Sequence, residues 1–316
     1  MMALRVTIAT DGFLEPDTMP PMAHELIFVP HSDPAALATA LADSDALVSR
    51  RVNVSQAFLA SAPVSRLRLI QQVGVGVDRI DLAAARARGI AVANTPGAPT
   101  TAVIEQTFLL ILAQLRDIAG QFQTLHAGRW SDAGDWNNGE IAGRTIGIFG
   151  LGSIGRGVAT RALAFEARVL ACGRASAPPA DVPAGVMIVG LPQLLAQSDI
   201  LVIAAALTPE TRGVIDRQKL ALMKTSAVLV NIARGAIVDE AALADALKAG
   251  RLAGAALDAF TREPLPMESP LRGLPGVVLT PHAGGATRES RDRIWAQMRA
   301  NLDRLGNGQP LANVVN

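Results

Sequence analysis

The stretch that most constrains the fold of this chain runs from residue 144 to 166 and reads RTIGIFGLGSIGRGVATRALAFE. A short apolar run leads into Gly150, Gly152 and Gly155, and apolar residues then recur at helical spacing. This order predicts a strand, a tight turn and a helix. Gly150 permits a sharp turn, Gly152 lets a pyrophosphate approach the backbone, and Gly155 lets the helix pack close to the strand. The first N–H groups of such a helix attract anions, so the stretch indicates a dinucleotide-binding domain; the alternative is a purely structural turn.

The composition limits the class of protein. With 316 residues, half of them hydrophobic, the chain is long enough for two domains with a sizeable core. Its 29 Lys and Arg residues nearly balance 28 Asp and Glu, and there is no long basic run, which argues against nucleic acid as a partner. The single cysteine, Cys172, excludes an internal disulfide and suits a reducing compartment. No segment resembles a signal peptide or a membrane span, so we expect a cytoplasmic protein with no membrane partner. We also expect no metal site.

Apolar runs alternate with helical patterns along the chain, which predicts an α/β fold with parallel sheets and helices on both faces. In the first part we expect strands at 4–9, 25–29, 46–49, 69–72 and 90–93 and helices at 33–42 and 83–88. Later strands are expected at 146–149, 169–172, 200–206, 227–232, 253–258 and 277–279, and helices at 191–197, 217–222, 241–249 and 287–305.

A Pro- and Gly-containing break at 94–97 looks like a crossing between domains. After it, we expect one long helix over 101–126, apolar on nearly every side. Such a helix is buried between domains or between subunits. We favour the second interpretation, and therefore a homodimer formed through this helix and the polar loop 128–143.

Several longer motifs occur in one order: VGVGVDRIDLAAARARGIAVANTPG, GRTIGIFGLGSIGRGVA, LVNIARGAIVDEAALADALKAGRLAGAALDAF, EPLP and LTPHAGGAT. On these motifs the chain resembles the D-isomer-specific 2-hydroxyacid dehydrogenases from residue 73 to about 293, most of all the glyoxylate/hydroxypyruvate reductases. The resemblance implies two Rossmann-like or flavodoxin-like domains with a cleft between them. A substrate domain would comprise 1–97 and 287–316, and an NAD(P)-binding domain 98–286.

Two polar residues follow apolar strands, where the carboxyl ends of parallel strands meet a ligand. The guanidinium of Arg234 is suited to a 2-oxo carboxylate, although an arginine here also fits as a loop cap. His282 suits a proton donor, since histidine titrates near neutral pH, but a lone histidine is more often structural. The resemblance implies that Arg234 anchors the substrate, that His282 protonates its oxygen, and that Glu263 pairs with His282 and keeps its acid form available.

The resemblance also implies the remaining contacts. Hydride from NAD(P)H would reach C2 of a small 2-oxo acid, giving the D-2-hydroxy acid, while backbone amides near Val75 and Gly76 help Arg234 and His282 to bind the substrate. Asp258 matches the position that contacts the nicotinamide amide. The implied cofactor-binding residues are Val75, Gly150, Gly152, Ser153, Ile154, Gly155, Gly173, Arg174, Ser176, Ala205, Ile232, Ala233, Asp258, Ala283, Gly284 and Gly285.

Two departures from the family pattern matter. NAD-preferring members usually place an acidic residue at the end of the second cofactor strand, where Gly173 stands here. Arg174 and Ser176 follow and suit a 2′-phosphate, so we expect NADP(H) to be favoured over NAD(H); the alternative is that Arg174 only stacks on adenine. In addition, Glu166 stands where a glycine is usual.

The substrate's side group is the least determined feature. Ser49, Arg50 and Val52 are expected on the loop that faces it. Arg50 and Arg51 either favour a polar or acidic substituent or are merely solvated. Glyoxylate and hydroxypyruvate are the leading substrates, with hydroxyphenylpyruvate and phosphite as alternatives. A rival class is a non-catalytic NAD(H)-sensing protein of the corepressor type, against which the complete set of Arg234, Glu263 and His282 argues.

Overall fold

The computed structural model describes residues 2–130, 138–173 and 181–316. The chain divides into two compact units, which we call unit 1 (Met1–Pro99 and Thr287–Asn316) and unit 2 (Thr100–Ala286). The assignment of 1–97 and 287–316 to a substrate domain and of 98–286 to an NAD(P)-binding domain stays a prediction. In the described residues, no helix has both the length and the apolar character needed to cross a membrane.

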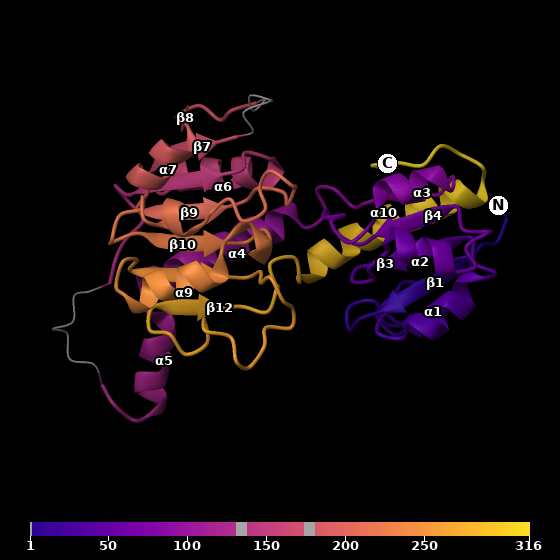
Figure 1. Ribbon diagram of the computed structural model, residues 1–316, viewed down its shortest axis with the longest axis horizontal. Helices are drawn as coiled ribbons and strands as arrows, with labels where there is room; N and C mark the ends of the chain where they lie inside the picture. Colours follow the sequence, from indigo (N-terminus) through magenta and orange to yellow (C-terminus); the bar gives the residue numbers. More distant parts are fainter. Residues whose placement is uncertain (1, 131–137, 174–180) are drawn as a thin grey trace. The chain divides into compact units, whose positions relative to one another are not determined.

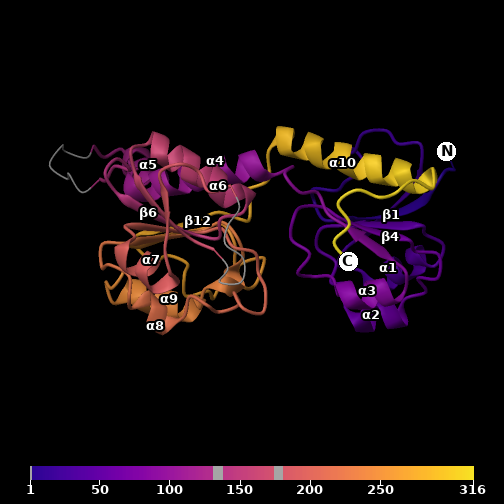
Figure 2. The same ribbon diagram turned by 90° about the horizontal axis from the view of Figure 1, so that it is seen from above.

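Unit 1 is built on a five-stranded parallel sheet. Its elements are β1 (Arg5–Thr10), β2 (Glu25–Pro30), α1 (Pro34–Leu41), β3 (Ala46–Ser49), α2 (Gln56–Ser61), β4 (Leu69–Gln72), α3 (Leu82–Ala87), β5 (Ala91–Ala93) and α10 (Arg288–Gly306). The strand order is β2-β1-β3-β4-β5, which is a flavodoxin-like arrangement. Helices α1, α2 and α3 cover one face of the sheet and α10 covers the other (Figures 1 and 2). Each face therefore buries its own hydrophobic cluster, the α10 face around Ile294, Trp295 and Met298.

Unit 2 is built on a seven-stranded parallel sheet. Its strands are β6 (Thr145–Phe149), β7 (Arg168–Cys172), β8 (Val186–Ile188), β9 (Ile200–Ile203), β10 (Val228–Asn231), β11 (Gly254–Leu257) and β12 (Val277–Leu279). Its helices are α4 (Thr100–Leu115), α5 (Ile118–His126), α6 (Ser153–Ala164), α7 (Leu191–Gln197), α8 (Arg217–Leu220), the 3₁₀ helix η1 (Gly235–Ile237) and α9 (Glu240–Lys248).

The strand order in unit 2 is β12-β11-β10-β9-β6-β7-β8. Since β6 lies between β7 and β9, the chain winds in one direction from β6 to β8 and in the other from β9 onward. This reversal is the mark of a Rossmann fold, in which ligands bind outside the carboxyl ends of the strands at the reversal point. Helices α4 and α6 lie on one face of the sheet, and α7, α8 and α9 lie on the other (Figure 2). The expected fold, two such units of parallel strands with helices on both faces, is confirmed.

The single long helix expected over 101–126 is wrong. The chain forms α4 and then α5, and it breaks at Asp117, which has a left-handed backbone (φ 44°) and caps α5 by accepting a hydrogen bond from Gly120 N–H. An aspartate favours such a cap over a helix interior, because its short side chain competes for backbone N–H groups. The burial also differs between the two helices: eight residues of α4 are buried, six of them in a hydrophobic cluster of unit 2, whereas α5 has none.

The position of Glu166, between α6 and β7, has a left-handed backbone with φ 61°. Glycine adopts this conformation without steric cost, whereas a residue with a Cβ is strained there. This backbone conformation explains why glycine is usual at this position. The backbone of Glu166 is strained there.

Candidate active site

The turn between β6 and α6 has the geometry that its glycines suggest. Gly150 has φ 102°, and a Cβ added to it would lie 2.5 Å from the backbone of Ala205, in the loop after β9. A Cβ on Gly155 would lie 2.0 Å from the Gly150 carbonyl oxygen, so the helix packs too closely on the turn for any side chain. By contrast, a Cβ on Gly152 would have no heavy atom within 4 Å. The surface beside Gly152 is therefore open to a ligand.

The first turn of α6 has N–H groups available for that ligand. Gly152 occupies the cap position, and no side chain there accepts a hydrogen bond from the helix. Ser153 and Ile154 begin the helix directly at the reversal point between β6 and β9. A helix of this length with an uncapped amino terminus favours a negatively charged group, so the turn fits the pyrophosphate of a dinucleotide.

The adenosine end of such a dinucleotide would lie beyond β7. This strand ends at the buried Cys172, and Gly173 follows it. Burial raises the pKa of the Cys172 thiol, which keeps the thiol neutral. Gly173 offers no carboxylate to the ribose hydroxyls. Arg174 and Ser176, expected to bind a 2′-phosphate, lie outside the described residues.

Arg234 lies just beyond the carboxyl end of β10, in a turn held by the buried Asn231. The Asn231 amide donates to the Arg234 carbonyl oxygen at 3.0 Å, and its oxygen accepts from Ala233 N–H at 3.0 Å. The same turn carries Ile232 and Ala233. A Cβ on Gly235 would lie 2.0 Å from the backbone carbonyl carbon of Phe260, so the Arg234 turn packs directly on the segment that leads to Glu263.

Glu263 and His282 form a hydrogen-bonded pair. His282 Nδ1 lies 2.8 Å from Glu263 Oε1, which also accepts from Phe260 N–H at 3.1 Å. Burial alone would raise the pKa of Glu263, but the hydrogen bond and charge of His282, with a smaller contribution from Arg234, hold that pKa below its usual value. Glu263 is therefore a carboxylate at neutral pH, and His282 Nδ1 is the donor of the pair. This leaves Nε2 as the ring nitrogen that can meet a substrate.

Asp258, at the end of β11, holds the turn that carries His282. Its side chain is buried, and its Oδ1 accepts from Thr280 Oγ1 at 2.5 Å and from Ala283 N–H at 2.8 Å, while Oδ2 accepts from Gly284 N–H at 2.8 Å. His282 lies within this clamp and has a left-handed backbone (φ 54°). A Cβ on Gly284 would lie 2.9 Å from Asp258 Oδ2, so only glycine lets the N–H approach this closely.

In unit 1, the loop after β4 presents backbone donors. Thr95 Oγ1 accepts from Gly74 N–H at 2.8 Å, and the Asn94 amide donates to the Val75 carbonyl oxygen at 2.8 Å. These bonds fix the loop, while Val75 is 44% exposed. Among the described residues, no hydrogen bond uses the N–H of Val75 or of Gly76. Two adjacent N–H groups of this kind suit a carboxylate.

The structure thus collects most of the expected site residues at one edge of one sheet. The turns and loops at the carboxyl ends of β6, β9, β10, β11 and β12 carry Gly150 to Gly155, Ala205, Ile232 to Arg234, Asp258 and His282 to Gly285. Val75 and Gly76 belong to unit 1 instead.

Several supporting residues were not expected from the sequence. Asn231 fixes the Arg234 turn, and Gln106 of α4 donates to Thr280 Oγ1 at 3.2 Å, which extends the Asp258 cluster into the helix layer. Polarity could have singled out both residues, since Asn231 ends an apolar strand and Gln106 interrupts an apolar helix. It could not reveal their hydrogen-bond partners, because these come from distant parts of the chain.

Comparison with known proteins agrees with this geometry. A sequence profile for the NAD-binding domain of the D-isomer-specific 2-hydroxyacid dehydrogenases matches residues 108–284, more than half of the chain. The chain therefore belongs to the D-isomer-specific 2-hydroxyacid dehydrogenases.

Two relatives illustrate the range of the family. The chain is 39% identical over 295 residues to glyoxylate/hydroxypyruvate reductase B of Pectobacterium carotovorum, covering 92% of this chain and 90% of that protein. It is 38% identical over 293 residues to D-3-phosphoglycerate dehydrogenase of Mycobacterium leprae, covering 92% of this chain but only 55% of that protein. The chain thus spans little more than half the length of the phosphoglycerate dehydrogenases that it matches.

Among solved structures, the chain superimposes with a TM-score of 0.86 on an NADPH-dependent glyoxylate/hydroxypyruvate reductase from Sinorhizobium meliloti, determined in complex with NADP and malonate. The two sequences are 28% identical, and the match covers 99% of this chain and 96% of that one.

Proposed function

We propose that this protein reduces a small 2-oxo acid, such as glyoxylate or hydroxypyruvate, to the D-2-hydroxy acid with NADPH as the hydride donor. The observation that carries the proposal is the arrangement of Arg234, Glu263 and His282, with the imidazole held by a 2.8 Å hydrogen bond to an ionised carboxylate. Family membership and the relatives named as glyoxylate/hydroxypyruvate reductases support it.

The site residues divide the reaction among them. When bound, NADPH supplies the hydride that reaches C2 of the substrate. Arg234 binds the substrate carboxylate through paired charge-assisted hydrogen bonds, together with the N–H groups of Val75 and Gly76. His282 donates a proton from Nε2 to the oxygen on C2, while Glu263 holds the tautomer and balances the imidazolium charge. In this scheme unit 2 binds the cofactor and unit 1 contributes to substrate binding.

The preference for NADPH over NADH is a more specific proposal than the reaction itself. It is supported by Gly173, which leaves the end of β7 without a carboxylate, and by the cofactor of the Sinorhizobium meliloti reductase. The test compares kcat/KM for NADPH and NADH in the wild type and in Gly173→Asp, which restores an acidic group. We expect the wild type to prefer NADPH and the variant to shift toward NADH; a wild-type preference for NADH would refute this part alone.

We also propose that the protein forms a homodimer. Apolar side chains of α4, α5 and the following segment are exposed in the single chain: Leu109, Phe122, Leu125 and Trp130. We propose that a second copy of the chain covers these side chains. Sedimentation velocity tests this, with a dimer expected for the wild type and a monomer for Phe122→Asp/Leu125→Asp. The single cysteine fits the cytoplasmic location that we also propose.

The activity itself is tested by NADPH consumption with a panel of 2-oxo acids, in the wild type and in His282→Ala. We expect turnover by the wild type and its near loss in the variant. If the wild type turns over no substrate of the panel but still binds NADPH, a cofactor-sensing protein becomes the better interpretation.

A further inference from the structure

The two backbone donors in residues 73–76, which we call the substrate loop, belong to peptide groups whose carbonyl oxygens are already bonded. The N–H of Val75 shares a planar peptide group with the carbonyl of Gly74, and the N–H of Gly76 shares one with the carbonyl of Val75. Both peptide bonds are trans, so each N–H points away from the C=O of its own group. The contacts that fix the two carbonyl groups therefore also set the directions of the two N–H groups.

Two residues directly after β5 hold these carbonyl groups. Thr95 N–H donates to the Gly74 carbonyl oxygen at 3.0 Å, and Thr95 Oγ1 donates to the same oxygen at 3.3 Å. The Asn94 amide donates to the Val75 carbonyl oxygen at 2.8 Å. Asn94 is 8% exposed and Thr95 is fully buried. The Asn94 side chain thus sets the direction of the Gly76 N–H, and Thr95 sets that of the Val75 N–H.

Asn94 is in turn held by the interior of unit 1. The peptide group that precedes it is bonded at both ends: Gln71 Nε2 donates to the Ala93 carbonyl oxygen at 3.3 Å, and Asn94 N–H donates to the Asn313 carbonyl oxygen at 3.2 Å. Gln71 is fully buried, and its Oε1 accepts from the amide of Asn301, in α10, at 2.8 Å. Strand β4, helix α10 and the C-terminal segment therefore all contribute to the placement of Asn94.

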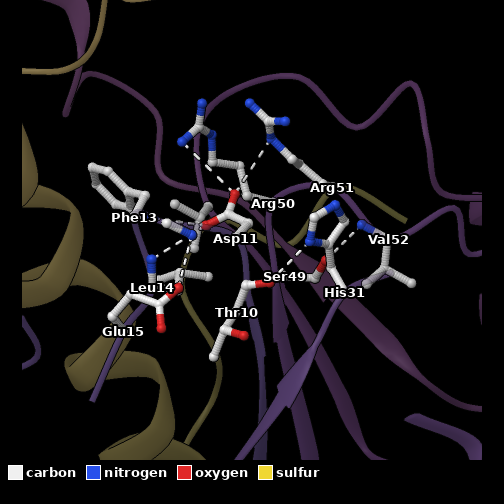
Figure 3. A network of polar contacts seen from close by, with 12 residues as sticks. Thr10, Asp11, Phe13, Leu14, Glu15, His31, Ser49, Arg50, Arg51 and Val52 are labelled. Carbon is white, nitrogen blue, oxygen red and sulfur yellow. Dashed lines mark hydrogen bonds and ion pairs between the residues drawn. The ribbon is translucent and has the colours of Figure 1, made fainter. Parts of the chain in front are cut away.

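The turn after β3, on the other side of the substrate loop, is also fixed (Figure 3). Ser49 Oγ accepts from Val52 N–H at 3.0 Å. The fully buried side chain of Asp11 lies with its Oδ2 3.7 Å from Arg50 Nη1 and 3.6 Å from Arg51 Nε. These contacts give the turn a defined conformation against which the substrate loop can pack.

The first part of the substrate loop is bonded to that turn. Val73 N–H donates to the Ser49 carbonyl oxygen at 2.8 Å. The Gln72 side chain donates to the carbonyl oxygens of Arg50 at 3.3 Å and of Val73 at 3.2 Å. These bonds reach the first peptide group of the loop. The next two peptide groups, which carry the proposed donors, are held by the two residues after β5.

We propose that Asn94 is a positioning residue for substrate binding, which directs the Gly76 N–H toward the carboxylate of the 2-oxo acid. The hydrogen bond from its amide also polarises the Val75–Gly76 peptide group, which makes the Gly76 N–H a stronger donor to an anion. Asn94 acts through this peptide group and need not touch the substrate. The inference rests on the proposed function, since it takes a 2-oxo acid as the ligand of the loop.

The role predicts a particular kinetic signature. The substrate carboxylate keeps its charge while hydride reaches C2, so donors to this group bind the substrate and the transition state about equally. Loss of such binding raises KM and leaves kcat nearly unchanged. A residue that only stabilises the fold would instead lower the free energy of unfolding without a selective change in KM for the 2-oxo acid.

The test compares Asn94→Ala with Thr7→Val, a matched control from the same unit. Thr7 is fully buried in β1, and its Oγ1 lies 2.7 Å from Ser44 Oγ, so the control also removes one hydrogen bond of a buried side chain. For Asn94→Ala we expect KM for glyoxylate to rise about 10-fold, with less than about 3-fold change in kcat and in KM for NADPH. For Thr7→Val we expect less than about 2-fold change in each. An unchanged KM for glyoxylate in Asn94→Ala, or equal rises in both variants, would overturn the inference.

Two further measurements separate positioning from folding and from catalysis. Asn94→Asp keeps the shape of the side chain but places an acceptor opposite the Val75 carbonyl oxygen, so it must raise KM for glyoxylate at least as much as Asn94→Ala. Titration calorimetry with oxamate, in the presence of NADPH, reports binding of a 2-oxo acid analogue without turnover. We expect its Kd to rise about 10-fold in Asn94→Ala and to stay unchanged in Thr7→Val.

The calorimetry also distinguishes this inference from the proposed function. If no 2-oxo acid is reduced, the proposed function fails, but oxamate binding that is weakened in Asn94→Ala alone still supports the positioning role. Absence of oxamate binding by the wild type, or equal binding by the wild type and Asn94→Ala, would overturn the positioning role whether or not the protein is a reductase.

Discussion

The clamp formed by Asp258 gives a quantitative prediction. Asp258→Asn preserves the shape of the side chain but replaces one acceptor oxygen with an NH₂ group. In the better orientation the remaining oxygen accepts from Thr280 and Ala283, and the NH₂ group then faces the N–H of Gly284, which lies 2.8 Å from Oδ2 in the wild type. Two donors would meet in a buried site.

A buried donor without an acceptor costs about 1–3 kcal/mol, and the surviving bonds lose their charge assistance. We therefore expect the free energy of unfolding to fall by roughly 2–3 kcal/mol. The turn also holds His282 in a left-handed conformation that is strained for a non-glycine residue. Loosening it should displace the imidazole and lower kcat by roughly 10- to 100-fold.

Urea denaturation measures the first effect and steady-state kinetics with glyoxylate the second. Thr280→Val is the matched control, because it removes one donor to Asp258 but keeps both backbone bonds; a loss of about 1 kcal/mol is expected. The Kd for NADPH of Asp258→Asn separates two roles of Asp258. If Asp258 contacts the nicotinamide, as expected from the family resemblance, the variant must bind NADPH more weakly; if Asp258 only holds the His282 turn, weaker binding is not required. Unchanged stability and kcat in Asp258→Asn would refute the clamp.

Three further predictions concern single residues. Arg234→Lys keeps the charge but loses the paired hydrogen bonds, so KM for glyoxylate should rise by about 10-fold or more with a smaller change in KM for NADPH; equal changes would contradict carboxylate binding. The folded state lowers the pKa of Glu263 below its ordinary value of 4.5, so the stabilisation from its pair with His282 is fully present above pH 4.5 and is lost as pH falls through the folded pKa. The difference in free energy of unfolding between the wild type and Glu263→Gln should therefore shrink below pH 4.5. A difference that does not change with pH would exclude the ion pair. Glu166→Gly should raise the free energy of unfolding by about 0.5–1 kcal/mol, since relief of the left-handed backbone exceeds the entropy cost of glycine; destabilisation would show that Glu166 makes a compensating interaction.

Much of the fold was predictable because its signals are local. The turn around Gly150 was readable from the spacing of its glycines, and its strand and helix appear where expected, as β6 and α6. Strand ends were less accurate. The strand expected over 200–206 stops at Ile203, because the apolar run continues into a loop where Ala205 packs against Gly150.

Other features depend on contacts that one sequence does not reveal. The helix expected over 101–126 divides at Asp117, whose capping role outweighs the apolar periodicity around it. The helix α2 and strand β8 were not expected, since both are short and have weak patterns. The pairing of Glu263 with His282 was implied only by the family resemblance, because the residues lie on different loops; the polar bonds around Asp258 and the partners of Arg50 and Arg51 required the tertiary structure.

In the proposed reaction, this chain transfers hydride from NADPH to C2 of a 2-oxo acid. The test uses NADPH with both hydrogens on C4 of the nicotinamide replaced by deuterium, so that either face delivers label, with glyoxylate as substrate and mass spectrometry of the product. We expect glycolate with one deuterium on C2 from the wild type, and at most trace label from His282→Ala at equal NADPH saturation. Unlabelled product, or a wild type that binds NADPH and transfers no deuterium to any 2-oxo acid tested, would contradict it.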